Sequence, residues 1–360
     1  MAFGLPSFSR PASTPLLGID ISPSSVKVVE LDDAAGGGVG LRTYAIEQID
    51  KGAVVDGNIE QPEVVAAALT RALSRMGSRT REAALAMPAS AVIAKRIRLP
   101  AGLTEEDYEF QVESEASNYI QFPIEDVNLD FQILGAVGAE ADEVDVLLVA
   151  SRKEQVEDRV AIAEMCGLQA VVVDVESYAA CLAVQYVTDG LPSHAQGEVI
   201  AVFDIGSQAT ALSVYLDAEI VFEREQAFGG QILTQDLVRL YGLTPEEAEL
   251  KKKSGDLPAG FQSEVLAPFV DQGAANISRT LQFFFTSTEY TKVDRIYLAG
   301  GTSVVPGLLE AVAERTQLPT ALLLPFEGMQ LGAGVRERQL EVDAPALMTA
   351  CGLALRRFGP

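Results

Sequence analysis

The chain has 360 residues, of which 48% are apolar and 22% charged, and this composition is typical of a globular protein with room for two or three domains. Its 51 acidic and 27 basic side chains give a net charge of −24, which excludes nucleic acid and disfavours an anionic membrane surface as a direct ligand. Three widely spaced cysteines fit a reducing cytosol, and a single histidine, His194, argues against a zinc site. No stretch approaches the roughly 18 uncharged apolar residues of a membrane span.

The first predicted element is a β-hairpin at residues 16–29, which read LLGIDISPSSVKVV. Two apolar runs flank a short polar turn that follows Asp20. Residues 61–76 carry apolar side chains at helical spacing after Pro62, which predicts a helix. Two strand-like runs follow and are separated at Pro88.

Residues 90–165 are predicted to form a small strand–helix–strand–strand–helix unit inside the first half. Thr104, followed by Glu106 and Asp107, is a predicted N-cap with an acidic first turn. Strands are predicted at 127–134 and 143–151.

After this unit come a buried strand and helix at 169–187 and a loop at 188–198. A second hairpin follows at 199–215, and then two helices between 229 and 256, of which the second has a start signal at Thr244. A long helix at 263–290 contains Phe283, Phe284 and Phe285, which are predicted to pack in the core. The chain closes with an apolar helix.

The two hairpins repeat one pattern, because Asp20 and Asp204 are 184 residues apart and each follows an apolar run. This spacing, near half the chain, predicts a duplication with different insertions in each half.

The second hairpin is the stronger candidate for a phosphate loop. ATP requires hydrogen-bond donors for its phosphates, acidic groups that hold Mg²⁺ with its waters, and a slot for the base. Gly206 permits close backbone approach, Ser207 and Gln208 offer donors, and Asp204 can hold a metal-bound water. Turns of this kind are also common in ordinary hairpins, so the motif alone leaves that alternative open.

A third glycine turn, Ala299-Gly300-Gly301-Thr302, follows an apolar run and would let the backbone lie flat against an adenosine. Glu249 and Lys252 share a helix face and could hydrogen-bond a ribose or base. Taken alone, this pair also fits a solvent-exposed helix face.

The ordered set of motifs resembles the actin-like ATPase superfamily. The resemblance extends over nearly the whole chain: two phosphate loops after Asp20 and Asp204, an adenosine motif at 299–303, and two connecting segments, VVVDVESYAA and PALMTACGLAL. It implies an α/β fold of two duplicated halves around a nucleotide cleft.

The segment at 90–165 resembles the inserted 1C subdomain of two branches, FtsA and PilM. The run YIQFPIEDV at 119–127, followed by Leu129-Asp130-Phe131, is similar to the PilM insert, and the chain stops without the basic amphipathic helix usual in FtsA. The implied organisation is subdomain 1A at 14–89, 166–198 and 337–360, 1C at 90–165, 2A at 199–228 and 280–336, and 2B at 229–279.

The resemblance to the PilM family implies a cytoplasmic ATP-binding scaffold of the type IV pilus platform, peripheral to the inner membrane. Its implied partner is the N-terminal cytoplasmic peptide of PilN, held in a groove between 1A and 1C. Further implied contacts are with other platform or motor proteins and with a second copy of the chain; membrane contact is indirect. The alternatives are an FtsA-like division filament protein and a kinase of the same superfold.

The implied groove residues are apolar Ile97, Leu99 and Ile120, with Glu115 or Glu125 receiving an arginine of the peptide. The same apolar positions also fit the core of the insert.

The implied nucleotide site comprises ATP or ADP with Mg²⁺. Asp20 and Asp204 would hold waters of the metal ion, and Glu176 takes the position of an acidic residue near the attacking water. The phosphate contacts are Ser25, Gly206, Ser207 and Gln208, and the adenosine contacts are Gly300, Gly301, Glu249 and Lys252.

The first phosphate loop, which follows Asp20 and is called loop one, departs from the superfamily pattern. That pattern has glycine two residues after the aspartate. Ser22 adds a side chain there, and Pro23 removes an N–H donor. We therefore expect ATP binding with slow or negligible turnover.

Overall fold

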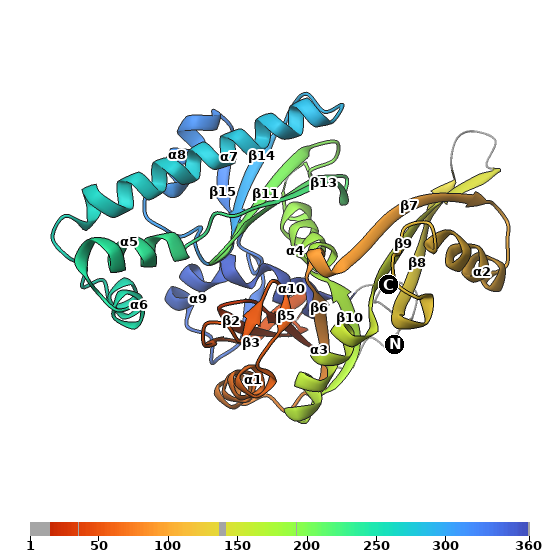
Figure 1. Cartoon of the computed structure of the whole chain (residues 1–360), viewed down its shortest axis with the longest axis horizontal. Coiled ribbons are helices and arrows are strands. Elements are labelled where there is room, and N and C mark those ends of the chain that lie inside the picture. The colour runs from red at the N-terminus through yellow and green to blue at the C-terminus, as the bar shows by residue number, and fades with distance from the viewer. Residues whose placement is uncertain (1–14, 35, 137–141, 192, 359–360) are drawn as a thin grey trace. The chain divides into compact units, whose positions relative to one another are not determined.

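The computed structural model describes residues 15–34, 36–136, 142–191 and 193–358, which divide into two units (Figure 1). The first comprises Met1–Ala180, Met329–Val335 and Thr349–Pro360, and the second Cys181–Gly328 and Arg336–Met348. Residue 14, the first of predicted subdomain 1A, and its last two residues lie outside the described part. The finer division into four subdomains stays a prediction.

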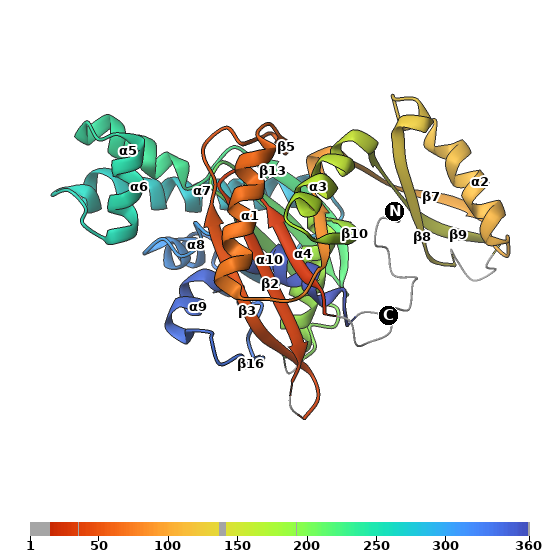
Figure 2. The ribbon, with the colours of Figure 1, turned by 90° about the horizontal axis from the view of Figure 1, so that it is seen from below.

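The first unit contains a six-stranded sheet in the order β10-β6-β1-β2-β3-β16. β1, β2 and β3 are antiparallel neighbours, whereas β6 and β10 continue the sheet in parallel, and β16 pairs in parallel with β3. Helix α1 packs on β2 and β3 (Figure 2). The bounds are β1 Leu17–Ile21, β2 Ser25–Asp33, β3 Val39–Gln48, β6 Glu82–Met87, β10 Gln169–Val175, β16 Gln330–Leu331, α1 Pro62–Met76 and, for a small hairpin, β4 Val54–Val55 and β5 Asn58–Ile59.

The second unit contains a five-stranded sheet in the order β13-β12-β11-β14-β15. Its core lies between this sheet and helices that include α5 and α7. The strands are β11 Val199–Ile205, β12 Thr210–Leu216, β13 Glu219–Gln226, β14 Arg295–Ala299 and β15 Thr320–Leu322. The helices are α5 Gln231–Tyr241, α6 Pro245–Ser254, η3 Gln262–Leu266, α7 Ala267–Ser287, α8 Leu308–Thr316, α9 Glu337–Asp343 and η4 Ala344–Leu347.

The two sheets share one topology. β3-β2-β1-β6-β10 in the first unit has the same order and the same strand directions as β13-β12-β11-β14-β15 in the second. Both start with an antiparallel hairpin at the centre and continue with parallel strands. This agreement is what the predicted duplication requires.

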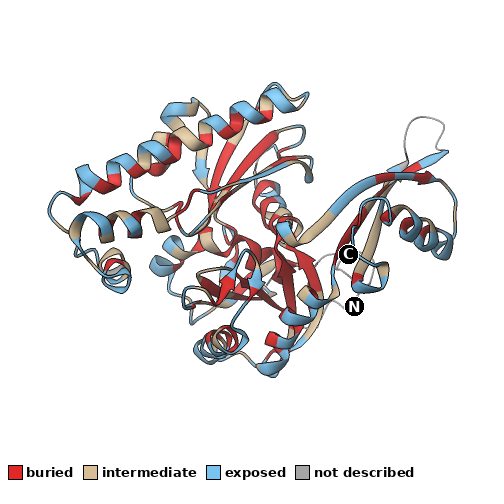
Figure 3. Cartoon of the chain, viewed as in Figure 1, coloured by how far each residue is buried: buried red, intermediate tan, exposed pale blue. Residues whose placement is uncertain are grey.

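Residues 89–165 form the predicted strand–helix–strand–strand–helix order. The antiparallel sheet β7-β9-β8 has α2 packed on one face (Figure 3). Buried apolar residues of the sheet and of α2 form one core. Thr104 caps α2 by accepting a hydrogen bond from Asp107 N, which confirms the predicted helix start. The bounds are η1 Ala89–Ala91, β7 Val92–Pro100, α2 Glu105–Ala116, η2 Ile124–Asp126, β8 Val127–Ala136, β9 Glu143–Arg152 and α3 Lys153–Met165.

The remaining helices show where local patterns succeed and fail. Thr244 and Glu247 form the full capping box at the start of α6, as predicted. The prediction that all three phenylalanines of α7 pack in the core is wrong for Phe283, which is 43% exposed beneath the guanidinium of Arg224. Phe284 is fully buried.

No helix in the described ranges is long and apolar enough to cross a membrane.

Two glycines allow close packing around β1. Helix α10 (Met348–Leu355) packs beside it, and a Cβ added at Gly352 of α10 would lie 1.7 Å from the carbonyl oxygen of Ala179 in α4 (Glu176–Asp189). A Cβ at Gly18 would lie 2.0 Å from the carbonyl oxygen of Ala350. No real Cβ approaches backbone so closely, so α10 can lie against both β1 and α4 only because both residues lack a side chain.

We expect Gly352→Ala to lower the free energy of unfolding by about 3 kcal/mol, because the backbone of α4 or α10 must shift to admit the methyl group. Gly334→Ala is the matched control, since a Cβ there meets no atom within 4 Å. Urea unfolding of both variants measures the difference. Equal stability of the two variants would contradict this packing.

Candidate functional site

The first candidate half-site is the turn between β1 and β2. Ser22 N donates to the carbonyl oxygen of Ser25 over 3.0 Å, and the hydroxyl of Ser22 donates to the same oxygen over 2.9 Å. The side chain that replaces the usual glycine is therefore folded back onto its own turn. Ser25 is buried, and its hydroxyl lies 3.3 Å from that of Ser22.

The turn between β11 and β12 closes in the same way. Gly206 N donates to the carbonyl oxygen of Ala209 over 2.9 Å, which matches the bond from Ser22 to Ser25. The dihedral φ of Gly206 is not in the left-handed region, and an added Cβ would lie 3.2 Å from that oxygen, so the position is tight. The two hairpins thus repeat one turn geometry.

The second turn is also held by the chain around it. Thr302 N donates to the carbonyl oxygen of Ile205 and its hydroxyl to that of Gly206, over 3.0 and 2.8 Å. Gly230 N donates to the same Gly206 oxygen, and Gln231 N donates to that of Ser207 over 2.8 Å. Because three successive carbonyls have internal partners, the turn is fixed before any ligand arrives.

Asp20 is the main electrostatic feature of the first half-site. It is 5% exposed on β1, and its carboxylate accepts a 2.7 Å ion pair from Lys27, which lies opposite it on β2. The residue opposite Asp204 in the second hairpin is Ala211. The two half-sites therefore share a turn but differ in charge, because Lys27 supplies a cation next to the predicted metal-binding carboxylate.

The two glycines of the predicted adenosine motif have different environments. Gly300 is buried with φ at +82°, and a Cβ there would lie 2.3 Å from a carboxylate oxygen of Asp204. Gly301 is exposed, and its nearest neighbour would be Ala346 at 3.8 Å. Gly300 thus packs against the second hairpin, whereas Gly301 presents open backbone.

Glu249 and Lys252 lie together on α6 and are tied to α5. Lys252 Nζ donates to Glu249 over 2.9 Å and to the hydroxyl of Thr234 over 2.8 Å, and that hydroxyl also donates to Glu249. Lys252 reaches the carbonyl oxygen of Gly230 at 3.5 Å, and Gly230 N donates to Gly206 in the turn between β11 and β12. The pair is therefore one ordered cluster linked to the second hairpin.

Glu176 is half-buried at the first position of α4. Its charge, with those of Asp158 and Asp20, acts on Arg159, which is 2% exposed. Burial lowers the pKa of the Arg159 guanidinium, and these carboxylates oppose that effect. Three carbonyl oxygens accept from the guanidinium, those of Ala86, Gln155 and Gly57. A buried positive charge therefore lies within electrostatic reach of the first half-site.

A separate cavity of about 260 Å³ lies in the first unit between the start of β7, the end of β9 and the segment after α2. Its walls include Ile93, Ile120, Phe122 and Val127, with Arg152 beside them. Phe122 is 49% exposed, and the guanidinium of Arg152 lies 5.3 Å from the centre of its ring. The cavity is largely apolar with one cationic rim residue, and such a site suits an apolar side chain of a peptide.

The predicted groove residues are only partly brought together here. Ile120 lines the cavity, but Ile97 and Leu99 are buried in the core between the insert's sheet and α2. Glu125 is exposed two residues before Val127, and Glu115 accepts a hydrogen bond from Asn118 over 3.2 Å. Neither carboxylate lines the cavity itself.

A family model for type IV pilus assembly protein PilM matches residues 18–358. The chain belongs to the PilM family. A solved structure described as the PilM-PilN type IV pilus biogenesis complex is similar over 96% of this chain and 99% of that chain, with 26% identity and a TM-score of 0.78. These matches confirm the predicted PilM family and its actin-like ATPase fold.

More distant structures share the fold alone. The ethanolamine utilization protein EutJ from Carboxydothermus hydrogenoformans is 18% identical with a TM-score of 0.57, over 99% of this chain and 92% of that one. Diol dehydratase-reactivating factor in nucleotide-free form is 12% identical with a TM-score of 0.52, over 95% and 99%.

The sequence patterns did not single out Lys27 and Arg159, the two cations near Asp20. Lys27 could have been found, because a tight turn between residues 21 and 26 forces residue 27 opposite residue 20. Arg159 gave no such signal, since it lies in a charged helical stretch whose pattern is typical of a solvent-exposed helix.

Among the described residues, no three His, Cys, Asp or Glu side chains are close enough to hold a metal ion by themselves.

We expect Lys27→Met to weaken ATP binding about tenfold or more, because the variant would lose the cation beside Asp20 that we expect to attract a phosphate. Lys27→Arg, which keeps the charge, should retain most of the affinity, and Lys51→Met, at an exposed position, should retain all of it. Fluorescence titration with a labelled ATP analogue measures the three constants. If a folded Lys27→Met variant binds ATP with unchanged affinity, Lys27 takes no part in ATP binding.

Proposed function

We propose that this protein is an ATP-binding scaffold of the type IV pilus inner-membrane platform that holds the N-terminal cytoplasmic peptide of a PilN protein. The observation that carries the proposal is the match to the PilM-PilN complex over nearly the full length of both chains. The membership of the PilM family supports the pilus context. In this role the scaffold reaches the inner membrane from the cytoplasm through its partner.

The nucleotide part of the proposal rests on the repeated turn. Ser25 in the first hairpin and Gly206, Ser207 and Gln208 in the second are the proposed contacts for ATP phosphates. Lys27 adds a cation at the first half-site. Gly301, Glu249 and Lys252 would frame the adenosine, and the ordering of the last two by Thr234 supports this role.

The residues present fit a hydrated Mg²⁺ better than a directly bound one. Asp20 already pairs with Lys27, and Asp204 comes from the other half-site. When bound with ATP, the metal ion would neutralise phosphate charge. The roles of Asp20 and Asp204 would then be to hold and orient its water ligands.

Slow hydrolysis follows from the chemistry of the first turn. The first N–H of each turn, from Ser22 or Gly206, is used to close that turn, but Pro23 lacks the N–H donor that Ser207 has at the matching position. Fewer donors remain there for the charge that develops during phosphoryl transfer. Glu176 remains the proposed residue near the attacking water. We infer that the protein holds ATP and turns it over slowly.

The partner peptide would place an apolar side chain in the cavity beside Ile93, Ile120 and Phe122. The exposed ring of Phe122 offers an anchor that needs no rearrangement of the core. An arginine of the peptide would approach Glu125 or Glu115 outside the cavity. Ile97 and Leu99 act on this site by supporting the sheet from within.

We expect Phe122→Ser to weaken binding of a synthetic PilN N-terminal peptide by about tenfold or more, because the exposed ring that the peptide would cover is lost. Phe110→Ser is the matched control, since Phe110 is 73% exposed on α2 and does not line the cavity. Calorimetry with and without ATP and Mg²⁺ measures both variants.

The outcomes separate the partner from its site. If both variants lose the same peptide affinity, or neither loses any, the cavity is not the peptide site. PilN would still stand as the proposed partner. An absence of binding by the unaltered protein to any such peptide would refute the proposed partner. The double variant Glu115→Lys, Glu125→Lys tests the charge contact, which fails if its affinity is unchanged.

A further inference from the structure

The sheet β7-β9-β8 of the insert has a second face, opposite the one that α2 covers. Residues that pair directly across antiparallel strands share a face, so the strand register defines its members. We call it the open face. Its three rows, each read across β7, β9 and β8, are Val92, Ser151 and Asn128, then Ala94, Val149 and Asp130, then Arg96, Leu147 and Gln132.

Val149, in the middle row, is buried although it lies on the side of the sheet away from α2. Its side chain is 1% exposed, yet none of the apolar clusters formed by described residues contains it. An antiparallel sheet with one free face normally presents exposed side chains there. The burial of Val149 therefore indicates that a segment outside the described residues covers this row.

Asp130, the neighbour of Val149 in the same row, is a half-buried carboxylate without a cation beside it. It accepts a hydrogen bond from Phe131 N over 2.8 Å and forms no ion pair with a described residue. Burial raises the pKa of its carboxyl group to about 6. The middle row thus combines a covered apolar side chain with an acid whose charge is poorly compensated.

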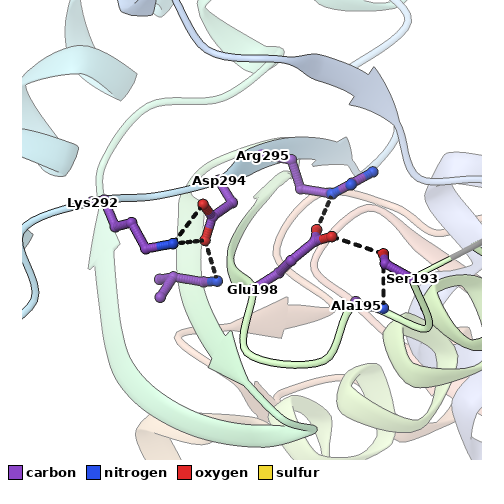
Figure 4. A network of polar contacts seen from close by, with 7 residues as sticks. Ser193, Ala195, Glu198, Lys292, Asp294 and Arg295 are labelled. Carbon is purple, nitrogen blue, oxygen red and sulfur yellow. Dashed lines mark hydrogen bonds and ion pairs between the residues drawn. The ribbon is translucent and has the colours of Figure 1, made fainter.

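Half-buried carboxylates in the second unit do have cations beside them (Figure 4). Glu198 accepts 2.8 Å hydrogen bonds from the hydroxyl of Ser193 and from Arg295 Nε, which lowers the pKa of its carboxyl group. Asp294 pairs with Lys292 over 2.8 Å. A cation beside the carboxylate of the open face would likewise favour its charged form.

Residues 1–14 have the composition that this face requires. They precede the described part of the chain and read MAFGLPSFSRPAST, with Arg10 as their only charged side chain. Phe3 and Leu5 are two residues apart, a spacing that puts both on one side of an extended segment. The segment can therefore offer apolar side chains to Val149 and a guanidinium to Asp130.

The segment is also long enough to reach the open face. Fourteen extended residues span about 46 Å. The segment leads into Pro15 and β1, where Leu17 pairs with Ala83 at the start of β6. From Ala83 to Met87 the strand β6 rises about 13 Å, and Met87 belongs to the cluster on which Val92 of the open face packs.

We propose that residues 1–14 dock as a strap on the open face of the insert, with apolar side chains over Val149 and Arg10 paired with Asp130. Val92 and Ser151 belong both to this face and to the wall of the proposed peptide cavity. A docked strap therefore lies beside the peptide site and competes with the peptide, a consequence that rests on the proposed function.

Alkylation of an engineered cysteine tests the docking without any peptide. Deletion of residues 1–10 should speed alkylation of Val149→Cys about tenfold or more, because the cover of that side chain is removed. Val146→Cys is the matched control, since Val146 is fully buried on the α2 side of the same strand and should react equally slowly with and without residues 1–10. Peptide mapping by mass spectrometry follows each site. Equal rates for Val149→Cys in the full and shortened chains would overturn the proposal.

The charge contact is tested in the full chain with the same Val149→Cys readout. Arg10→Gln and Asp130→Asn should each speed alkylation several-fold, and the two together no more than either alone, because both remove one contact. Asp126→Asn, at an exposed position, should change nothing. Independent effects of the two substitutions, or none, would overturn the pairing.

Two further measurements identify the origin of the strap and its consequence. A photoreactive benzoylphenylalanine in place of Phe3 should cross-link to β8 or β9 within one chain, whereas cross-linked dimers would overturn the proposal. The shortened chain should bind the PilN peptide several-fold more tightly, and unchanged affinity would refute the competition. If neither form binds the peptide, the proposed function fails, while the alkylation rates still decide whether the strap docks.

Discussion

The candidate nucleotide site depends on one hydrogen bond that occurs twice, from the first residue of each hairpin turn to the carbonyl oxygen three residues later. This bond sets where β1 and β11 end, and so it places Asp20 and Asp204 at equivalent positions in two sheets of the same topology. The rest of each half-site is built outward from it. Thr302, Gly230 and Gln231 hold the second turn, and Ile49 N donates to Ser24 in the first.

The two copies of this turn have diverged in chemistry while keeping their shape. The first carries Ser22 and Pro23 and a cation opposite its aspartate, whereas the second carries Gly206 and Ser207 and an alanine opposite. A serine can occupy the glycine position because φ there is ordinary, and its hydroxyl turns back to Ser25. The divergence therefore changes the hydrogen-bond donors that each turn offers and keeps the bond that closes the turn. Retention of ATP with slow hydrolysis is the consequence that we propose.

Local patterns made much of the fold predictable. The caps at Thr104 and Thr244, the two hairpins and the order of elements in the insert depend on residues near each other in sequence, and the structure has all of them. Contacts between distant segments were not predictable in the same way. Ile97 and Leu99 alternate as strand residues should, but the alternation does not tell that α2 covers their side of the sheet. Likewise, nothing local indicates that Gly300 packs against Asp204.

The most direct test of the account exchanges the first turn for the second. The double variant Ser22→Gly, Pro23→Ser gives loop one the residues of loop two, and phosphate release and ATP affinity are measured beside the unaltered protein. We predict that the unaltered protein hydrolyses ATP far more slowly than a typical enzyme rate of about 10 s⁻¹, and that the exchange tightens ATP binding and speeds hydrolysis. The claim is that Ser22 and Pro23 make the first turn the weaker of the two in binding phosphate. Hydrolysis by the unaltered protein at that typical rate, or an exchange that changes neither quantity, would contradict it.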